Sequence, residues 1–130
     1  MSVRCLLDTC TFLWTLEGSR KLTSRVRRQI ENPENRVLFS AVSAWEIAVK
    51  HAAGRLPLPG SVDDFIGEGR SGHGLEALVF DARCTYHLHR LPQVHRDPFD
   101  WMLICQAIEH DLTILTPDPM IRKYPIKTLW

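Results

Sequence analysis

The sequence of 130 residues lacks the features that mark secreted, disulfide-stapled or membrane-spanning chains. No two of its cysteines form a CxxC pair, and no basic and apolar leader precedes them. Nowhere do about 18 apolar residues follow one another, the length that a membrane-spanning helix requires. We therefore expect a soluble, cytoplasmic protein without membrane association, in which the thiols stay reduced. The cysteines are Cys5, Cys10, Cys84 and Cys105.

The chain also lacks a large excess of charge of one sign. With 16 Lys and Arg against 15 Asp and Glu, the formal net charge is only +1. Any binding of nucleic acid must therefore depend on a local patch rather than on bulk attraction. No stretch is repetitive or of low complexity, and 45% apolar and 24% charged residues are typical of a globular protein. Length and composition predict a single domain over residues 1–130.

Short apolar runs alternate with helical patterns along the chain. Runs of this length without Gly or Pro are typical of strands buried on both faces, as in a parallel sheet with helices on either side. The alternation predicts an α/β fold with right-handed crossovers. The expected strands are Val3–Leu7, Arg36–Ser40, Leu75–Phe80 and Leu112–Leu115, with a possible edge strand at Ile126–Leu129.

Helices are expected between these strands. The most apolar of them, Pro98–His110, is apolar nearly all round, so we expect it to lie flat against the sheet. Trp14, Trp45 and Trp101 fall at helical positions and are interpreted as packing residues. The glycines of residues 67–74 predict a weak helix end followed by a mobile turn. The other expected helices are Thr11–Glu17 stopped by Gly18, a helix capped by Thr23 or Ser24 and closed by Asn32-Pro33, Ser43–Ala53, Val62 to about Gly69, a helix capped by Asp81 and running to about His89, and a short turn from Asp118.

Carboxylates stand where the predicted strands end or where the following helices begin. Asp8 follows the first strand, and Glu46 lies in the first turn of the helix after the second. Asp100 lies in the first turn of the buried helix, and Asp118 follows the Thr-Pro that ends the fourth strand. Because ligands of parallel sheets bind outside the carboxyl ends of the strands, these acids are candidate site residues.

Each acid also has a local structural explanation. Asp8 can cap the helix that follows it. Ser43 and Glu46 have the spacing of a capping box, in which the glutamate reaches back to the Ser43 amide. Asp97 can cap the buried helix, with Pro98 at its first position and Asp100 near its positive end. A purely structural role therefore remains open for each acid taken singly.

Taken together, the acids predict a metal site, because a parallel sheet brings these positions to one edge. Several carboxylates placed so close together repel one another, and a hard divalent cation offsets that repulsion. No Cys or His stands near them at metal-ligand spacing, so oxygen ligands favour Mg²⁺ or Mn²⁺ over zinc. Such ions activate water and stabilise charge on a phosphate, which makes metal-dependent phosphodiester hydrolysis the expected reaction.

Several neighbours of the acids are candidates for supporting or binding roles. The hydroxyls of Thr9 and Thr116 flank Asp8 and Asp118 and either orient the carboxylates or form ordinary turns. Lys50 lies four residues after Glu46, so it either pairs with that acid or contacts the substrate. His95 and Arg96 precede the buried helix, where a cation can meet a phosphate.

An ordered set of motifs across nearly the whole chain resembles the PIN domain, and within it the VapC-type ribonuclease toxins with SxWE and HRDPFD motifs. Any one motif is weak, but the set in this order is specific. One departure is Trp101, where the family more usually has arginine after DPFD. The motifs are Leu6-Leu7-Asp8-Thr9 with Phe12-Leu13-Trp14, Ser40 to Lys50 with Gly54, His95-Arg96-Asp97-Pro98-Phe99-Asp100, and Thr116-Pro117-Asp118.

The resemblance implies a three-layer α/β/α sandwich with a short parallel sheet of four to five strands. It also implies Mg²⁺-dependent endoribonuclease activity, with Mn²⁺ as a substitute, at a site formed by Asp8, Glu46, Asp100 and Asp118. Asp97 is assigned to the helix cap or an outer shell, and Ser43 to support. The implied partners are an RNA substrate, a cognate antitoxin protein and a second copy of the chain.

Two alternatives remain open at this stage. One keeps the fold and makes the protein a housekeeping nuclease in RNA processing or DNA repair, which a small antitoxin reading frame directly upstream would argue against. The other is a non-catalytic RNA-binding or interaction module in which the acids only cap helices. A gain of thermal stability with Mn²⁺ would separate a metal site from that module.

Overall fold

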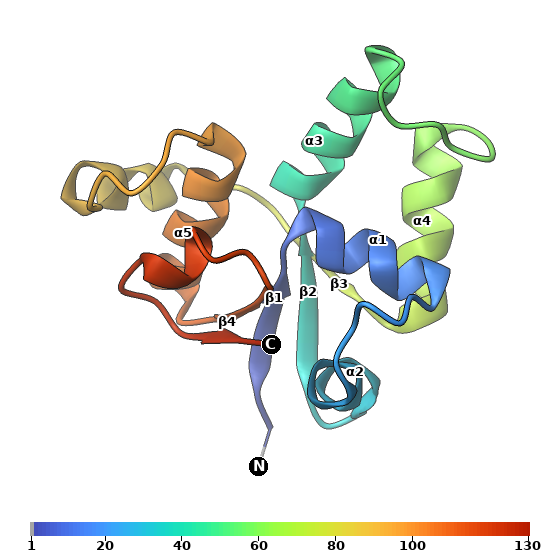
Figure 1. Ribbon diagram of the computed structural model, residues 1–130, viewed down its shortest axis with the longest axis horizontal. Coiled ribbons are helices and arrows are strands. Elements are labelled where there is room, and N and C mark those ends of the chain that lie inside the picture. Colours follow the sequence, from blue (N-terminus) through green and yellow to red (C-terminus); the bar gives the residue numbers. More distant parts are fainter. Residues whose placement is uncertain (1) are drawn as a thin grey trace.

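The fold is built on a five-stranded sheet in which every strand pairs in parallel with its neighbours. The computed structural model describes residues 2–130 and places the strands in the order β3-β2-β1-β4-β5 (Figure 1). The expected strands are all present, but only the second has the predicted bounds; the first and fourth are one residue shorter than predicted, and the third and fifth are shorter still. The strands are β1 (Arg4–Leu7), β2 (Arg36–Ser40), β3 (Glu76–Leu78), β4 (Thr113–Leu115) and β5 (Thr128–Leu129).

Helices connect the strands, and their ends follow local sequence chemistry. Thr23 caps α2 with its side chain, and Gly18 ends α1 in the left-handed conformation at φ 63°. Across residues 2–130, no helix is both long and apolar enough to cross a membrane. The α-helices are α1 (Thr9–Glu17), α2 (Ser24–Glu31), α3 (Ala41–Ala52), α4 (Val62–His73) and α5 (Pro98–His110), and short 3₁₀ helices are η1 (Ala82–Arg90) and η2 (Ile121–Lys123).

Four helical predictions were wrong in detail. Helix α1 begins at Thr9 rather than Thr11, directly after its N-cap Asp8. Helix α3 begins at Ala41 rather than Ser43, because the Ser40 hydroxyl accepts the Val42 amide and caps the helix two residues earlier. Helix α4 continues through the glycines that were predicted to end it, and it stops only at Gly74, where φ is 63°. The segment after Asp81 is a 3₁₀ helix rather than an α-helix.

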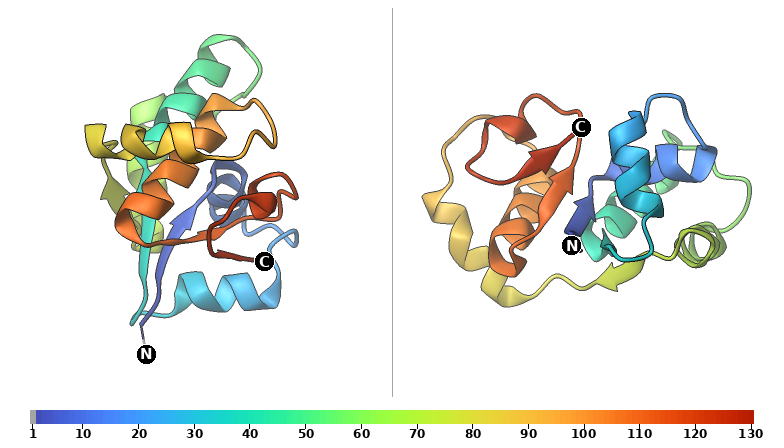
Figure 2. Two further views of the ribbon diagram at one scale, coloured as in Figure 1. Left: turned by 90° about the vertical axis from the view of Figure 1, so that its left-hand side faces the viewer. Right: turned by 90° about the horizontal axis from the view of Figure 1, so that it is seen from below.

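Side chains of the central strands alternate between two apolar layers. Cys5 and Leu7 of β1 face a cluster formed with α1, α2, α3 and α4, whereas Leu6 faces a cluster formed with α5 and the C-terminal segment. Strand β2 alternates in the same way. Figures 1 and 2 show α5 on one side of the sheet and α1, α2 and α4 on the other. The three-layer α/β/α architecture is therefore confirmed.

Helix α4 packs against α1 at one of its glycines. A Cβ added at Gly69 would lie 2.5 Å from Cδ2 of Leu16, whereas a Cβ added at Gly67 would meet nothing within 4 Å. Gly69 is buried and Gly67 is exposed. The close approach of the two helices therefore needs a glycine at position 69 but not at position 67.

Substitution by alanine should stabilise the protein at Gly67 but not at Gly69. Gly67→Ala should raise the free energy of unfolding by about 1 kcal/mol, because alanine is the better helix former at an exposed position. Gly69→Ala should lose that gain, because its methyl group displaces Leu16. Urea denaturation of both variants measures the difference. Equal stabilisation by the two substitutions would contradict this packing.

Candidate active site

The four candidate acids lie on segments that meet at the carboxyl end of the sheet. Asp8 directly follows β1, and Asp118 lies shortly after β4, which pairs with β1 in parallel. Helix α3, which carries Glu46, leaves the end of β2. Helix α5 runs back toward the start of β4, so its first turn with Asp100 lies at the same edge (Figure 1).

Asp8 is a buried carboxylate with uncharged partners. Its side chain is nearly out of solvent, and it accepts hydrogen bonds from the Thr11 amide at 2.9 Å and from the Thr116 hydroxyl. The Cys10 thiol lies 3.3 Å from the same carboxylate. Burial raises the pKa of Asp8, although the hydrogen bonds from Thr11 and Thr116 act in the opposite direction. Asp8 is also the N-cap of α1.

Glu46 is held by a hydroxyl pair and a lysine. Thr9 Oγ1 lies 2.7 Å from Glu46 Oε1 and 2.9 Å from Ser43 Oγ. Because a hydroxyl has one hydrogen, Thr9 donates to the carboxylate and accepts from Ser43. Lys50 Nζ lies 2.7 Å from the other oxygen, Glu46 Oε2. The capping box predicted for Ser43 and Glu46 is therefore wrong, since both side chains turn toward Thr9.

Asp100 ends a chain of hydrogen bonds that starts at Trp101. The indole Nε1 of Trp101 donates to Tyr124 Oη at 3.2 Å, and Tyr124 Oη lies 2.8 Å from His95 Nδ1. His95 Nε2 in turn lies 2.8 Å from Asp100 Oδ2. This order assigns the imidazole proton to Nε2, where it faces the carboxylate. Burial raises the pKa of Asp100 to about 6, and the His95 hydrogen bond opposes the rise.

Asp118 and Asp97 hold local backbone turns beside these acids. Asp118 Oδ1 accepts the Met120 amide at 2.8 Å, and the Asp118 amide donates to Thr116 Oγ1 at 3.0 Å. Thr116 therefore bridges Asp118 to Asp8 through one hydroxyl. Asp97 caps α5 by accepting the amides of Phe99 and Asp100. The negative charges of Asp97 and Asp118 also raise the pKa of Asp100.

The acids share one edge but do not form a closed metal cluster. Within residues 2–130, no three acidic, histidine or cysteine side chains come close enough together to hold a metal ion in this arrangement. Lys50 pairs with Glu46 and so offsets part of the mutual repulsion, while His95 donates a hydrogen bond to Asp100. The donors nevertheless fit a hard divalent cation, because they are carboxylate oxygens and the buried Asp8 has only uncharged partners.

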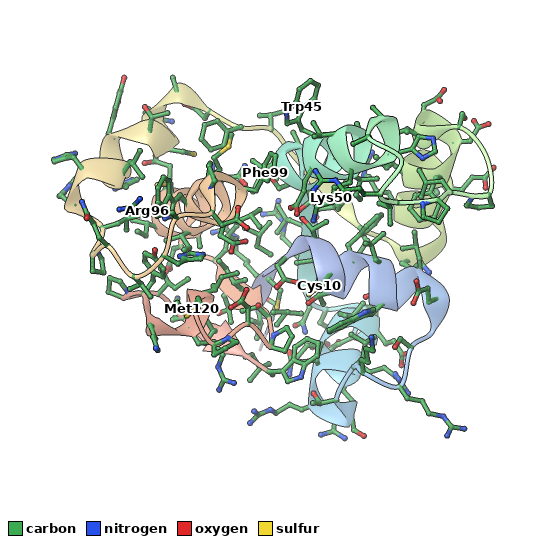
Figure 3. The ribbon with its side chains drawn as sticks, turned by 45° about the horizontal axis from the view of Figure 1, so that its top comes forward. Cys10, Trp45, Lys50, Arg96, Phe99 and Met120 are labelled. Atoms are coloured by element: carbon green, nitrogen blue, oxygen red, sulfur yellow. The ribbon has the colours of Figure 1, made fainter. Side chains whose placement is uncertain are left out.

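One residue beside the site differs from its sequence-based interpretation, and another was missed by it. Trp45 is 64% exposed, so its interpretation as a packing residue was wrong. It projects at the top of the view in Figure 3, while Cys10, Lys50 and Phe99 lie nearer the centre. The local motifs gave no indication of Tyr124, which is buried and positions His95 from a distant segment. Arg96 is exposed.

Comparison with known proteins finds a matching protein-family model and one relative that matches over part of its length. A protein-family model described as PIN domain matches residues 5–127. Ribonuclease VapC16 of Mycobacterium tuberculosis (strain ATCC 25618 / H37Rv) is 31% identical over 64 residues, which cover 49% of this chain. The match spans about half of the length of that relative, 45%.

Two solved structures share the fold at low sequence identity. The structure of VapBC2 from Rickettsia felis bound to a DNA fragment from its promoter matches with a TM-score of 0.75 and 15% identity, over 98% of this chain and 99% of that chain. DNA-bound VapBC from Salmonella typhimurium matches with a TM-score of 0.66 and 19% identity, over 98% and 97%.

The hydrogen bonds of Tyr124 predict a stability role for its hydroxyl. Tyr124→Phe should lower the free energy of unfolding by about 1 kcal/mol, because Nδ1 of the partly buried His95 loses its partner. Tyr86→Phe is the matched control, since Tyr86 is 60% exposed. Urea denaturation should separate the two variants, and an unchanged midpoint for Tyr124→Phe would contradict the proposed chain of hydrogen bonds.

Proposed function

This chain belongs to the PIN domain family, and on that premise we propose that it is a metal-dependent endoribonuclease acting as the toxin of a toxin–antitoxin pair. The observation that carries the proposal is the convergence of four acids from separate segments on one edge of the parallel sheet. A cap-only role needs no such convergence. It also leaves unexplained why the buried Asp8 has donors that are all uncharged: an amide, a thiol and a hydroxyl.

The acids would hold Mg²⁺, with Mn²⁺ as a substitute, through the side chains of Asp8, Glu46, Asp100 and Asp118. When bound, the ion would activate water and stabilise negative charge on the phosphate. The residues around the acids hold them in place: Thr116 holds Asp8, Thr9 and Ser43 hold Glu46, and Asp97 holds the first turn of α5.

Three basic side chains would serve the RNA strand. Lys50 and His95 contact Glu46 and Asp100 in the free protein, and binding of a divalent ion there would release them toward a phosphate. Exposed Arg96 is available for a phosphate directly. These residues form a local basic rim beside the acids, as a chain with a net charge of only +1 requires.

The proposed partners are a cognate antitoxin and a second copy of the chain. The similar structures from Rickettsia felis and Salmonella typhimurium are described as VapBC assemblies, which supports a bound partner of the antitoxin type here. An antitoxin segment would block access of RNA to the acidic edge. We place this activity in the cytoplasm, where the free thiols of Cys5, Cys84 and Cys105 would remain reduced.

Substitution of Asp8 tests the activity without removing the helix cap. Asp8→Asn should lower the rate of RNA cleavage at least about a hundredfold, because an amide removes the charge at the centre of the site. Asparagine still caps α1, so far-ultraviolet circular dichroism should not change. Cleavage of a single-stranded RNA in the presence of Mg²⁺ is the measurement.

The matched control is Asp81→Asn, which alters an exposed helix cap away from the site. This variant should cleave RNA at the wild-type rate. Undiminished cleavage by Asp8→Asn would rule out the proposed site. A folded wild-type protein that cleaves no RNA would favour the non-catalytic module.

Metal binding should stabilise the protein through the same residues. Addition of Mn²⁺ to the metal-free protein should raise the unfolding temperature, by an amount equivalent to about 2.7 kcal/mol at a hundred times the dissociation constant. Excess chelator should reverse the effect, and Asp8→Asn should lose most of it. Differential scanning calorimetry measures these shifts. An equal shift in wild type and variant would place the ion elsewhere.

A further inference from the structure

A pocket beside the candidate site is lined by the end of η1, the loop that follows it and the first turn of α5. Its volume is about 570 Å³, and its side chains are mixed in character. We propose that this pocket receives one nucleobase of the RNA strand next to the cleavage site, an inference that rests on the proposed nuclease function. The residues that carry it are Leu91, Gln93, His95, Arg96 and Trp101.

Trp101 offers an aromatic face whose orientation is fixed by its edge. The indole Nε1 is 3.0 Å from the His95 carbonyl oxygen and 3.2 Å from Tyr124 Oη. The only polar group of the ring is therefore bonded within the protein, and its face is left for contacts in the pocket. Stacking on such a face suits any nucleobase, because every base has a π-face.

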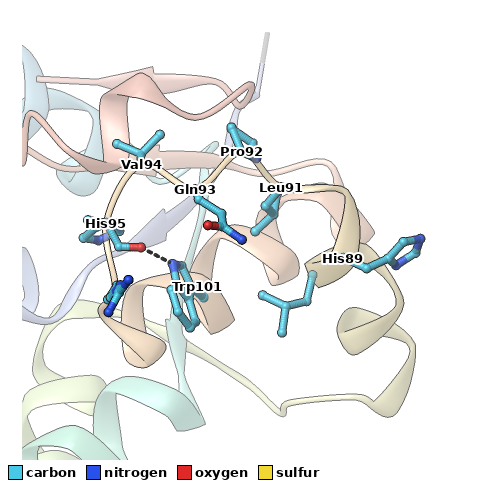
Figure 4. A pocket seen from close by; sticks show the side chains of 9 residues that line it. His89, Leu91, Pro92, Gln93, Val94, His95 and Trp101 are labelled. Atoms are coloured by element: carbon cyan, nitrogen blue, oxygen red, sulfur yellow. Dashed lines mark hydrogen bonds between the residues drawn. The ribbon is translucent and has the colours of Figure 1, made fainter.

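Polar groups lie where the edge and the phosphate of a nucleotide would be. Figure 4 shows the Gln93 side chain extending toward the indole of Trp101, whereas the His89 ring points away from it. A carboxamide both donates and accepts hydrogen bonds, so Gln93 can bind the edge of a stacked base. Arg96 lines the same pocket and supplies the cation that a neighbouring phosphate requires.

The pocket is connected to the candidate site by one side chain. His95 lines the pocket, and its Nε2 lies 2.8 Å from Asp100 Oδ2. Only the side chain of His95 therefore separates a base stacked on Trp101 from Asp100, and one RNA strand can reach both the pocket and the acids. A second hollow of about 220 Å³ shares Leu88 and Trp101, but it is almost wholly apolar and has no cation for a phosphate.

The experiment uses the Asp8→Asn protein, which binds RNA without cleaving it, with the tryptophan indoles labelled with ¹⁵N. A short single-stranded RNA of mixed sequence is added, and inorganic polyphosphate is the probe without bases. The Trp101→Phe variant assigns the Trp101 resonance among Trp14, Trp45, Trp101 and Trp130. The Trp101 indole resonance should shift with RNA and not with polyphosphate, while that of Trp14 should stay unchanged.

Variants test the same contacts through affinity. Trp101→Leu should weaken RNA binding about tenfold, as expected for loss of one base stack, whereas Trp101→Phe should retain most of the affinity. Gln93 is exposed, so Gln93→Ala should leave folding intact and weaken binding about fivefold. Arg96→Gln should weaken RNA and polyphosphate alike. Arg90→Gln, an exposed cation outside the pocket, should change neither.

Each contrary result has a distinct meaning. RNA cleavage by the wild type together with an unmoved Trp101 resonance would overturn the base pocket and leave the nuclease proposal standing. A shift confined to Trp45 would place the base on α3 and overturn the pocket. An equal response of Trp101 to polyphosphate would identify a phosphate site instead. Absence of both cleavage and RNA binding would remove the proposed function and this inference together.

Discussion

The buried carboxylate of Asp8 is the constraint on which the arrangement of the site depends. Removing a carboxylate from water costs free energy unless donors surround it, and Asp8 is only 4% exposed. The donors come from two segments: the Thr11 amide opens α1, and the Thr116 hydroxyl lies just after β4. The hydrogen bonds to Asp8 therefore fix the path of the chain after β1 and after β4.

A capping role and a functional role are compatible for the same acid. Asp8 caps α1 through one oxygen, and its other oxygen accepts the Thr116 hydroxyl at the sheet edge. Glu46 does not cap its helix but accepts from Thr9 and pairs with Lys50. Acids that serve as caps are thereby held rigidly by the backbone, which is the preorganisation that a charged reaction site requires.

Sequence patterns predicted the elements whose formation depends on residues that are close in sequence. The apolar runs of β1 and β2 and the Asp97-Pro98 start of α5 depend on neighbours in sequence, and they appear where expected. The start of α3 was missed because the sequence offers two serines as caps. Thr9 contacts Ser43 and Glu46 across separations of 34 and 37 residues, and no local pattern contains these contacts. Tyr124 escaped prediction for the same reason.

Trp101 shows how one unusual residue can link two parts of a site. Its indole edge bonds both to the His95 carbonyl and to Tyr124, which itself contacts the imidazole of His95. The indole therefore fixes the loop that carries His95, and His95 in turn orients Asp100. An arginine at this position would bring a charge but no fixed aromatic face. Because one ring both walls the pocket and holds the loop, the position of a bound base and the orientation of Asp100 cannot vary independently.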